Sequence, residues 1–335
     1  MDGQTAKRVT MTDVGRMAGV SQVTVSRALS DPSKVSPDTL RKIREAIEAT
    51  GFVPNAIAGA LASNRSRLVT ALVPSITNIV YSSFIRSFSE RLRDAGYQLL
   101  LSETGFDPEE EQALITAHLS RRPDAMLLTG IHHSAQSRRQ LLGAGIPVVE
   151  VWDMTDTPID LCVGFSHAGA AQRVADFVLE AGYPQAATVT AADERAGRRR
   201  QAFAKRFEAE TGVPVPEAGV DGAASIAAGR AALTALIERE GFARGPIFCS
   251  SDQLAHGVLI EARSRGLRVP GDVAVIGFGD QDFARDLDPA LTTVRVDRDR
   301  LGQVAADAVL ARLDGGPPPD PVTDLGFEII RRASF

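Results

Sequence analysis

The sequence predicts an α/β fold preceded by a small helical head, and charge and hydropathy patterns both indicate this division. Residues 1–67 contain ten Lys and Arg against six Asp and Glu, a balance of +4, whereas the rest of the chain carries −9, for a net charge of −5. From Leu68 onward, apolar runs alternate with amphipathic segments. Such runs, joined by helices, are typical of parallel strands buried on both faces. A basic head on an acidic body indicates that only the head meets a polyanion.

The head contains signals for three short helices. Thr10 is suited to cap a helix over residues 11–18, which Gly19 ends. Ser21 begins a second helix over 22–30, and Ser36, followed by Pro and Asp, begins a third that stops at Gly51. Three helices in about 45 residues predict a very small core.

The second helix lies in the stretch GVSQVTVSRALS, which has no charged residue except Arg27. On a helix, Val25, Ala28 and Leu29 would form an apolar face toward the other two helices. The opposite face would carry Gln22, Val23, Ser26 and Arg27. These side chains are short enough to enter a DNA major groove, and Arg can bond guanine with two hydrogen bonds. The order helix, glycine-containing turn, helix predicts a helix-turn-helix domain.

The segment over residues 68–335 is long for one doubly wound sheet and suits two. Small ligands bind beyond the carboxyl ends of strands in such sheets, so two facing sheets would form a cleft. Between head and core, the small residues 56–63 predict either a loose linker or a weak helix that forms when a partner stabilises it, and we interpret the segment as a hinge.

Catalytic and cofactor motifs are incomplete, so neither an enzyme nor a cofactor is expected. The sequence GFGDQD after one strand lacks the third glycine of a dinucleotide loop, and no glycine-rich loop ends in Lys-Ser or Lys-Thr. His132 and His133 are adjacent and are expected in a solvated loop rather than on one metal. Cys162 and Cys249 fit buried thiols. Neither a secretory signal nor a membrane segment is evident, which indicates a cytoplasmic protein.

The head resembles the N-terminal domain of the lac repressor (LacI/GalR) family of transcription regulators. The resemblance covers about 55 positions, VTMTDVGRMAGVSQVTVSRALSDPSKVSPDTLRKIREAIEATGFVPNAIAGALAS. It implies that Gln22, Val23 and Arg27 read bases. It also implies contacts to the DNA backbone from Thr12, Ser21, Thr24, Ser26 and Asn55. Leu61 matches a leucine that family dimers insert into the minor groove, although a linker leucine without a role is the alternative.

The resemblance extends over the rest of the chain, for which it implies a core of the periplasmic-binding-protein type, made of two doubly wound α/β subdomains. The markers are VAVIGFGD followed by LDPALTTVRVD, while PSITN, PVVEVWD and DLCVGFSH are similar to gluconate-operon repressors. We expect crossings between subdomains near Phe165, Thr293 and Pro321. The implied parts are a head over 1–54, a hinge over 55–67, a first subdomain over 68–165 and 294–321, and a second over 166–293 and 322–335.

The resemblance also implies ligand-binding positions in the cleft. Arg199 matches the family's sugar-binding arginine, with Ala202 in place of a glycine, and Arg195 adds a second cation. Two arginines near one site would favour an acid sugar, although both could belong to a solvated helix start. Trp152 is either a stacking platform or a core ring. The remaining candidates are Ser75, Asn78, Ser251, Asp252 and Asp280.

These expectations describe a homodimeric repressor, with a tetramer as the alternative assembly. Its partners would be double-stranded operator DNA and a sugar acid such as gluconate. A transport-type sugar-binding protein, a neutral-sugar regulator, and corepressor or activator behaviour are the alternatives that the sequence leaves open.

Overall fold

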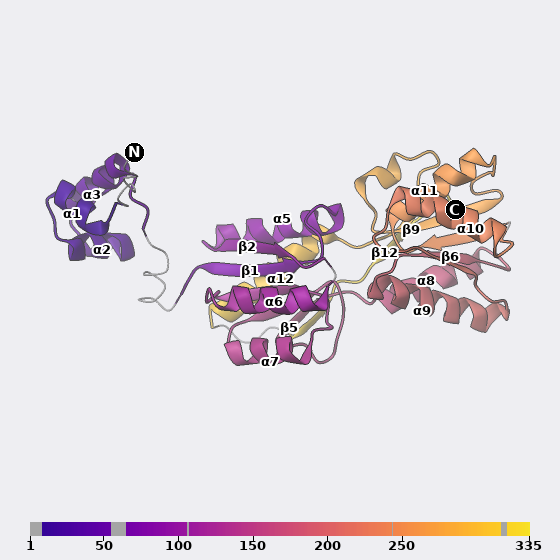
Figure 1. Ribbon diagram of the computed structural model, residues 1–335, viewed down its shortest axis with the longest axis horizontal. Coiled ribbons are helices and arrows are strands. Elements are labelled where there is room, and N and C mark those ends of the chain that lie inside the picture. The colour runs from indigo at the N-terminus through magenta and orange to yellow at the C-terminus, as the bar shows by residue number, and fades with distance from the viewer. Residues whose placement is uncertain (1–8, 55–64, 106, 243, 316–319) are drawn as a thin grey trace, which may run out of the picture. The chain divides into compact units, whose positions relative to one another are not determined.

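The computed structural model describes residues 9–54, 65–105, 107–242, 244–315 and 320–335. The chain forms two compact units, residues 1–67 and 68–335, and each is described by itself (Figure 1). Asn55, Leu61 and the whole predicted hinge helix, residues 56–63, lie outside the described residues.

The head contains the three predicted helices, α1 (Met11–Ala18), α2 (Gln22–Ser30) and α3 (Pro37–Thr50), with a short 3-10 turn, η1 (Pro32–Lys34). The Thr10 hydroxyl accepts a hydrogen bond from the backbone N–H of Asp13, whose carboxylate bonds the Thr10 N–H in return. Ser21 and Ser36 cap α2 and α3 as predicted. Reciprocal caps of this kind satisfy amide groups that a short helix leaves without partners.

The helices of the head enclose a small apolar core. Its buried members are Val14, Val25, Ala28, Ile43, Ala46 and Phe52. Gly15 permits the tight α1–α2 turn, because a Cβ there would lie 2.7 Å from the Val20 carbonyl oxygen. The expectation that Leu29 belongs to the core is wrong: its side chain is 38% exposed, since α2 is anchored through Val25 and Ala28 alone.

The first sheet of the second unit has six parallel strands in the order β11-β5-β4-β3-β1-β2. Their bounds are β1 (Leu68–Val73), β2 (Gln98–Glu103), β3 (Ala125–Thr129), β4 (Val148–Val151), β5 (Leu161–Gly164) and β11 (Val322–Asp324). The covering helices are α5 (Ile79–Asp94) and α12 (Arg298–Leu313) on one face, and α6 (Pro108–Leu119) and α7 (Ala135–Ala144) on the other.

The second sheet has the order β12-β10-β9-β8-β6-β7 and is parallel except for β12 against β10. Its strands are β6 (Ala187–Thr190), β7 (Glu217–Gly219), β8 (Gly245–Cys249), β9 (Val273–Phe278), β10 (Thr292–Arg295) and β12 (Glu328–Ile330). The helices α8 (His167–Glu180) and α9 (Glu194–Thr211) pack on one face, and α10 (Ile226–Glu238) and α11 (Asp252–Ser264) on the other; η2 (Asp282–Arg285) follows β9.

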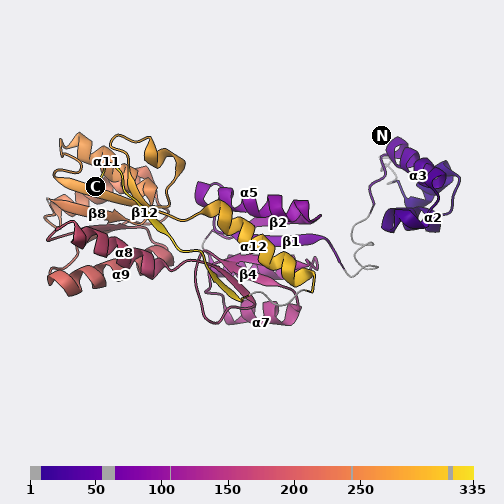
Figure 2. The same cartoon turned by 180° about the vertical axis from the view of Figure 1, so that it is seen from behind.

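The chain crosses between the two sheets three times, as the two views from opposite sides show (Figure 2). The first crossing follows Gly164, close to the expected position. Val294 and Arg295 still belong to β10, and β11 pairs with β5. The second and third crossings therefore follow Arg295 and Asp324, a few residues beyond the expected Thr293 and Pro321. The shift arises because β10 continues to Arg295 and because β11 lies just after Pro321.

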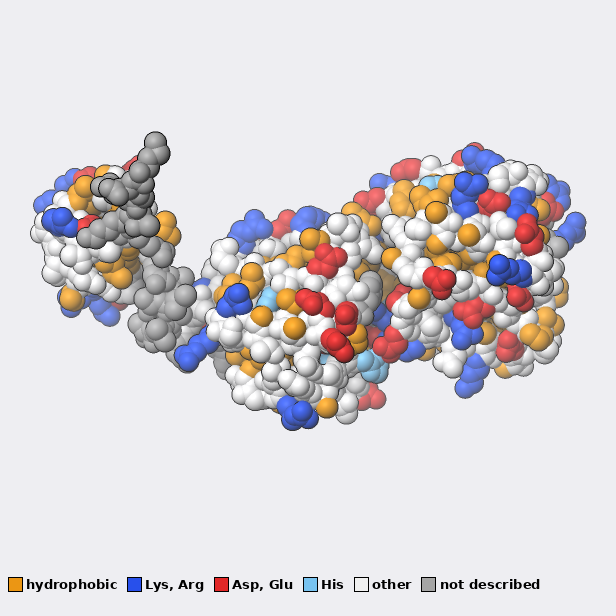
Figure 3. Space-filling model, in the orientation of Figure 1, with side chains coloured by type: hydrophobic (Ala, Val, Ile, Leu, Met, Phe, Trp, Pro, Cys, Tyr) orange, Lys and Arg blue, Asp and Glu red, His pale blue; other side chains and the backbone are white. Residues whose placement is uncertain are grey.

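The two faces of each sheet bury separate sets of apolar side chains. In β3, Leu127 faces α5 and α12, whereas Met126 and Leu128 face α6 and α7. This alternation explains why the strands read as continuous apolar runs in the sequence. The visible surface of the second unit carries acidic and basic side chains interspersed (Figure 3). Among the described helices, none has the length and hydropathy needed to cross a membrane.

Candidate nucleic-acid interface and ligand cleft

Helix α2 presents an uncharged polar face with one arginine. Gln22, Val23, Ser26 and Arg27 are all exposed, and Val23 is 65% exposed. Val25 and Ala28, on the opposite side, fix the helix to the core of the head. An exposed valine beside an arginine is costly in water but suits a groove in which a thymine methyl and guanine acceptors are offered.

Hydrogen bonds fix the N-terminal end of this face. The Thr12 hydroxyl of α1 donates to the Gln22 side-chain oxygen at 3.1 Å, which joins the two helices. The Ser21 and Thr24 hydroxyls lie 2.9 Å apart. The structure thus brings together seven of the nine DNA-contact candidates on or beside α2, while Asn55 and Leu61 lie outside the described residues. Hydroxyl groups at a helix N-terminus are suited to phosphate oxygens.

A cavity of about 530 Å³ lies between the two subdomains of the second unit. Loops and helix starts after the strands of both sheets line it, as expected for doubly wound sheets. Six of the eight ligand candidates belong to this lining: Ser75, Asn78, Trp152, Arg195, Arg199 and Ser251.

Arg199 is buried at the floor of the cavity. Its Nη1 donates to His167 Nδ1 at 2.8 Å and its Nη2 to the Ser250 carbonyl oxygen at 3.0 Å. The guanidinium also lies over the Phe278 ring, 4.3 Å from its centre. Burial lowers the pKa of Arg199 to about 10, so it remains charged at neutral pH. Its Nε is buried and has no hydrogen-bond partner among the described residues.

His167 is held as a neutral imidazole. Burial, and then the neighbouring Arg199 and Arg195, lower its pKa well below the ordinary value. Because arginine can only donate, Nδ1 of His167 must accept, and Nε2 carries the proton that is donated to the Trp152 carbonyl oxygen at 2.8 Å. His167 therefore orients Arg199 without adding a charge to the cavity.

Trp152 is both a core ring and part of the cavity lining. It is 5% exposed and makes edge-on contacts with Tyr81, Phe84 and Phe165. Its indole Nε1 has no hydrogen-bond partner among the described residues. Its backbone has φ 69°, a strained conformation for a side chain of this size. A buried donor and local strain at a cavity wall are both typical of ligand sites.

Asp252 and Asp280 do not line the cavity, in contrast to the expectation. Asp252 is fully buried and accepts hydrogen bonds from the Thr293 hydroxyl at 2.5 Å and from the Gln281 N–H at 2.7 Å. Burial raises the pKa of Asp252 to about 6, and these bonds oppose the rise. Asp280 instead pairs with Arg295 at 2.6 Å and Arg332 at 2.7 Å. The two carboxylates order the loop after β9 and are already satisfied by protein groups.

Several lining residues escaped the sequence analysis. They are Tyr81, Phe165, His167, Gln253, Phe278, Gln281 and Arg298, among others. His167 and Arg298 could have been found, since each opens a helix directly after a buried strand, where doubly wound folds place ligand groups. The aromatic residues lie in ordinary apolar runs, so nothing in the sequence distinguished them from core residues.

The cavity is electropositive. Among the described residues that line it, Arg195, Arg199 and Arg298 stand against a single carboxylate, that of Asp193, which caps α9. Arg195 Nη2 donates to the Tyr81 hydroxyl at 3.0 Å, and Arg298 Nη1 to the Gly279 carbonyl oxygen at 3.1 Å. Three guanidinium groups in a partly enclosed space favour an anion that can accept several hydrogen bonds.

His133 is buried, so the expectation of a solvated loop is wrong for this residue. Its Nδ1 lies 2.8 Å from Glu111 Oε1 and its Nε2 3.4 Å from Glu150 Oε1. Burial alone would lower the pKa of His133, but the two carboxylates outweigh it and raise the pKa to about 9. His132 is exposed, and its Nε2 lies 3.1 Å from Glu194 Oε1.

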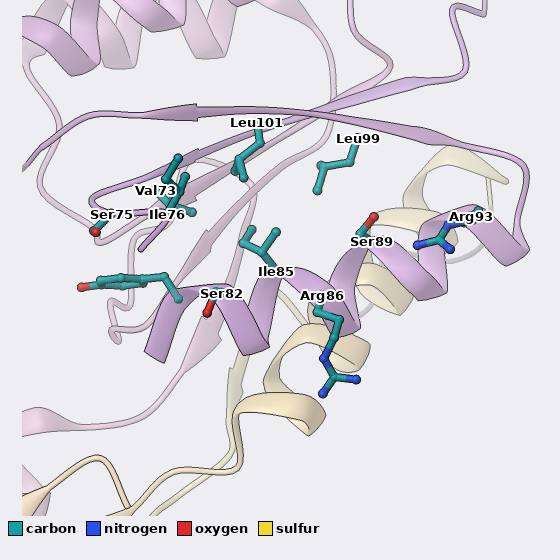
Figure 4. Close-up of a pocket in the computed structure, with 11 residues that line it drawn as sticks. Val73, Ser75, Ile76, Ser82, Ile85, Arg86, Ser89, Arg93, Leu99 and Leu101 are labelled. Atoms are coloured by element: carbon teal, nitrogen blue, oxygen red, sulfur yellow. The ribbon is translucent and has the colours of Figure 1, made fainter. Parts of the chain in front are cut away.

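A groove of about 370 Å³ runs between α5 and the edge strand β2. Ile85, Leu99 and Leu101 face its interior, and Arg86 and Arg93 lie along its side (Figure 4). It shares only Ser75 and Tyr81 with the cleft, and none of the buried arginines. The buried arginine that characterises the cleft, Arg199, is thus absent from the described lining of this groove.

An exposed reading helix in one unit and a positively charged cleft in the other define a ligand-responsive DNA-binding protein. Comparison with known proteins agrees with this class. The family model described as bacterial regulatory proteins, lacI family, matches residues 10–55, and that of the periplasmic binding protein-like domain matches residues 175–335.

Full-length relatives identify the family. The HTH-type transcriptional regulator GntR of Pseudomonas aeruginosa is 34% identical over 99% of this chain and 97% of its own. The structure of a LacI family transcriptional regulator from Silicibacter pomeroyi is 32% identical, with a TM-score of 0.91 over 97% of this chain and 99% of its own. The lac repressor dimer bound to operator and an anti-inducer shares the fold, with a TM-score of 0.84, 23% identity and coverage of 98% and 99%. The chain belongs to the lacI family and is a transcriptional regulator rather than an enzyme.

Proposed function

We propose that the protein is a repressor whose operator binding is controlled by a sugar acid, gluconate or a close relative, in the cleft. The observation that carries this proposal is the set of three arginines around one cavity, with Asp193 as the only carboxylate among its lining residues. A neutral sugar would add no counter-charge for Arg195 and Arg199, whereas a carboxylate would accept hydrogen bonds from both. The resemblance to gluconate-operon repressors supports the same class.

In the head, Gln22, Val23 and Arg27 would read bases in the major groove. Thr12, Ser21, Thr24 and Ser26 would hold the helix on the DNA backbone. Their exposure, together with the burial of Val25 and Ala28, supports this assignment. Two copies of the chain would bind a pseudo-palindromic operator, one head to each half-site.

Control by the ligand would be a population shift. A sugar acid that binds one spacing of the subdomains more tightly would favour that spacing, and operator affinity would fall if the favoured spacing separates the two heads. The proposal includes the hinge, with Asn55 and Leu61 in contact with the DNA. This part of the proposal rests on the sequence. Because the partner is operator DNA, we propose that the protein acts in the cytoplasm.

A thermal-shift screen tests the effector. A ligand that binds only the folded state must raise the unfolding temperature by mass action. We expect a rise with gluconate, its 2-keto and 5-keto derivatives or 6-phosphogluconate, and none with glucose or galactose at equal concentration. The rise should be reduced in Arg195→Gln. A response to neutral sugars alone would contradict the sugar-acid assignment.

A second measurement tests the link to DNA. A duplex selected by the parent protein from a random pool would be titrated with and without the acid found in the screen. We expect weaker binding with the acid. Tighter binding would mean that the ligand is a corepressor, and an unchanged affinity would contradict control through the cleft.

A further inference from the structure

The first two turns of α9 connect the two subdomains through its arginines. Arg195 and Arg198 both reach residues of the first subdomain, Tyr81 in α5 and Asp153 after β4. Arg199, one residue further on, binds His167 and Ser250 in its own subdomain. One helix start thus carries cations directed to both sides of the cleft.

The contact between Arg198 and Asp153 is a two-pronged ion pair. Arg198 Nη1 donates to Asp153 Oδ1 at 3.0 Å, and Nη2 donates to Oδ2. The Asp153 side chain is 3% exposed, whereas that of Arg198 is 31% exposed. A buried carboxylate is strongly disfavoured without a partner charge, so a movement that separates these groups leaves Asp153 poorly compensated. The pair therefore favours the spacing of the subdomains in which it forms.

A second cross-subdomain contact lies beside it but is weaker. His132 Nε2 lies 3.1 Å from Glu194 Oε1, and this same oxygen lies 3.7 Å from Arg198 Nε. Both His132 and Glu194 are well exposed. Exposed ion pairs contribute little because water competes for both groups. The Arg198–Asp153 pair is thus the principal charged contact on this side of the cleft.

Neither member of the ion pair lines the cavity, but each is adjacent in sequence to a residue that does. Asp153 follows Trp152, and Arg198 precedes Arg199. A shift at the ion pair must therefore move Trp152 relative to Arg199. These two side chains carry the buried donors, indole Nε1 and guanidinium Nε, that have no hydrogen-bond partner among the described residues.

We infer that Arg198 and Asp153 are positioning residues, which hold the two walls of the cleft at the separation that an effector requires. The inference rests on the proposed function, since it concerns the regulation of that site. Without the pair, the effector-competent arrangement is less populated, and the apparent effector affinity falls by the same fraction. Operator affinity without effector would then stay constant or rise, because the competing arrangement is the one that binds DNA.

A double-mutant cycle tests this inference on the full-length protein. The variants are Asp153→Asn, Arg198→Gln and the double variant, measured for gluconate binding by calorimetry and for binding to the selected duplex without effector. We expect each single variant to bind gluconate about fivefold more weakly and the double variant to be no weaker than either, because the pair acts as one unit. Arg198→Lys, which keeps the charge, should recover most of the affinity.

A matched control is available on the same helix. Arg206 forms an ion pair with Asp176 of α8 at 2.7 Å, within a single subdomain. Arg206→Gln should leave gluconate affinity unchanged. Effects that add up in the double variant, or a parallel loss of operator affinity without effector, would overturn the inference. If Asp153→Asn fails to fold, Arg198→Gln and Arg198→Lys carry the comparison, since that side chain is partly exposed.

Amide exchange separates this inference from the proposed function. If the parent binds no sugar acid, the proposed effector fails, but the ion pair can still be tested in the free protein. Amides in the loop after β4 and in the first turn of α9 should then exchange faster in Asp153→Asn and Arg198→Gln than in Arg206→Gln. Equal exchange in all three variants would overturn the positioning role.

Discussion

In the proposed function, the head and the cleft both present arginine to an acidic partner, but they hold it in opposite ways. Arg27 is exposed on a short helix whose buried side consists of small apolar residues. Arg199 is buried, bonded to His167 and to a backbone carbonyl, and stacked on Phe278. We therefore expect ligand binding and folding stability to be separable at Arg27 in the head and coupled at Arg199 in the cleft. The loss of the buried Arg199 would leave its hydrogen-bond partners unsatisfied.

The largest expected effect is at Arg199. Arg199→Met should weaken effector binding about a hundredfold, the order expected for losing charge-assisted hydrogen bonds. It should also lower the free energy of unfolding by about 2 kcal/mol, because His167 Nδ1 and the Ser250 carbonyl lose their donor. Calorimetry and urea unfolding measure the two quantities. Arg200→Met is the control, since Arg200 pairs at the surface with Glu217. A loss of effector binding without any loss of stability in Arg199→Met would contradict the coupling expected in the cleft.

At Arg27 we expect a loss of binding alone. Arg27→Ala should weaken binding to the selected duplex about tenfold to a hundredfold, the usual value of a two-bond guanine contact, with the unfolding temperature unchanged. Fluorescence anisotropy at fixed salt measures this. Arg41→Ala, at a residue already paired with Asp38 and Glu45, should have a much smaller effect. If binding to random duplex fell equally, Arg27 would be a phosphate contact.

Outside both regions, the buried side chain of His133 makes the stability of the second unit depend on pH. Its pKa of about 9 in the folded state exceeds the ordinary value near 6.5, so the protonated form stabilises the fold. This contribution is complete below about pH 6.5 and is lost as the pH rises through 9. Between pH 6.5 and 9.5, urea unfolding should show the parent losing about 2 kcal/mol more than His133→Gln. His132→Gln, at an exposed neighbour, should behave as the parent does. Identical pH profiles for parent and His133→Gln would contradict a charged His133.

The smallest expected effect concerns the core of the head. Leu29→Ala should destabilise the head by about 0.5 kcal/mol, because much of the side chain already contacts water. Val25→Ala, at a fully buried position, should cost about 2 kcal/mol. Amide exchange of α3 in the full chain reports both values. Equal losses of stability in the two variants would indicate that Leu29 belongs to the core after all.

Much of the fold was predictable, because its signals are local. The caps at Thr10, Ser21 and Ser36 and the long apolar strands depend on neighbouring residues, and they appear where the sequence predicts them. The misplaced crossings involve β11 and the end of β10. Three-residue strands have no periodicity to detect, and their pairing depends on β5 and β9, far away in the sequence.

The cleft was predictable as a location but not in its details. The resemblance to the lac repressor family points to Ser75 and Ser251, and a strand end points to Trp152; all three line the cavity. Asp280 also lies near a family ligand position, yet its positive φ of 46° and the side chains of Arg295 and Arg332 take its carboxylate elsewhere. The position of the Asp280 carboxylate thus depends on two arginines that only the folded chain brings together.

The course of α12 has a consequence for the order in which the protein can be completed during synthesis. This helix follows β10 of the second sheet in sequence, yet it packs on α5 of the first sheet, so closely that a Cβ on Gly302 would lie 2.6 Å from the Phe84 carbonyl oxygen. Until residue 313 has left the ribosome, this face of the first sheet is covered by α5 without α12, and Phe84 and Phe88 lack part of their packing. The sheet that begins first in the sequence is therefore completed only near the end of the chain, by β11, shortly before β12 completes the second sheet.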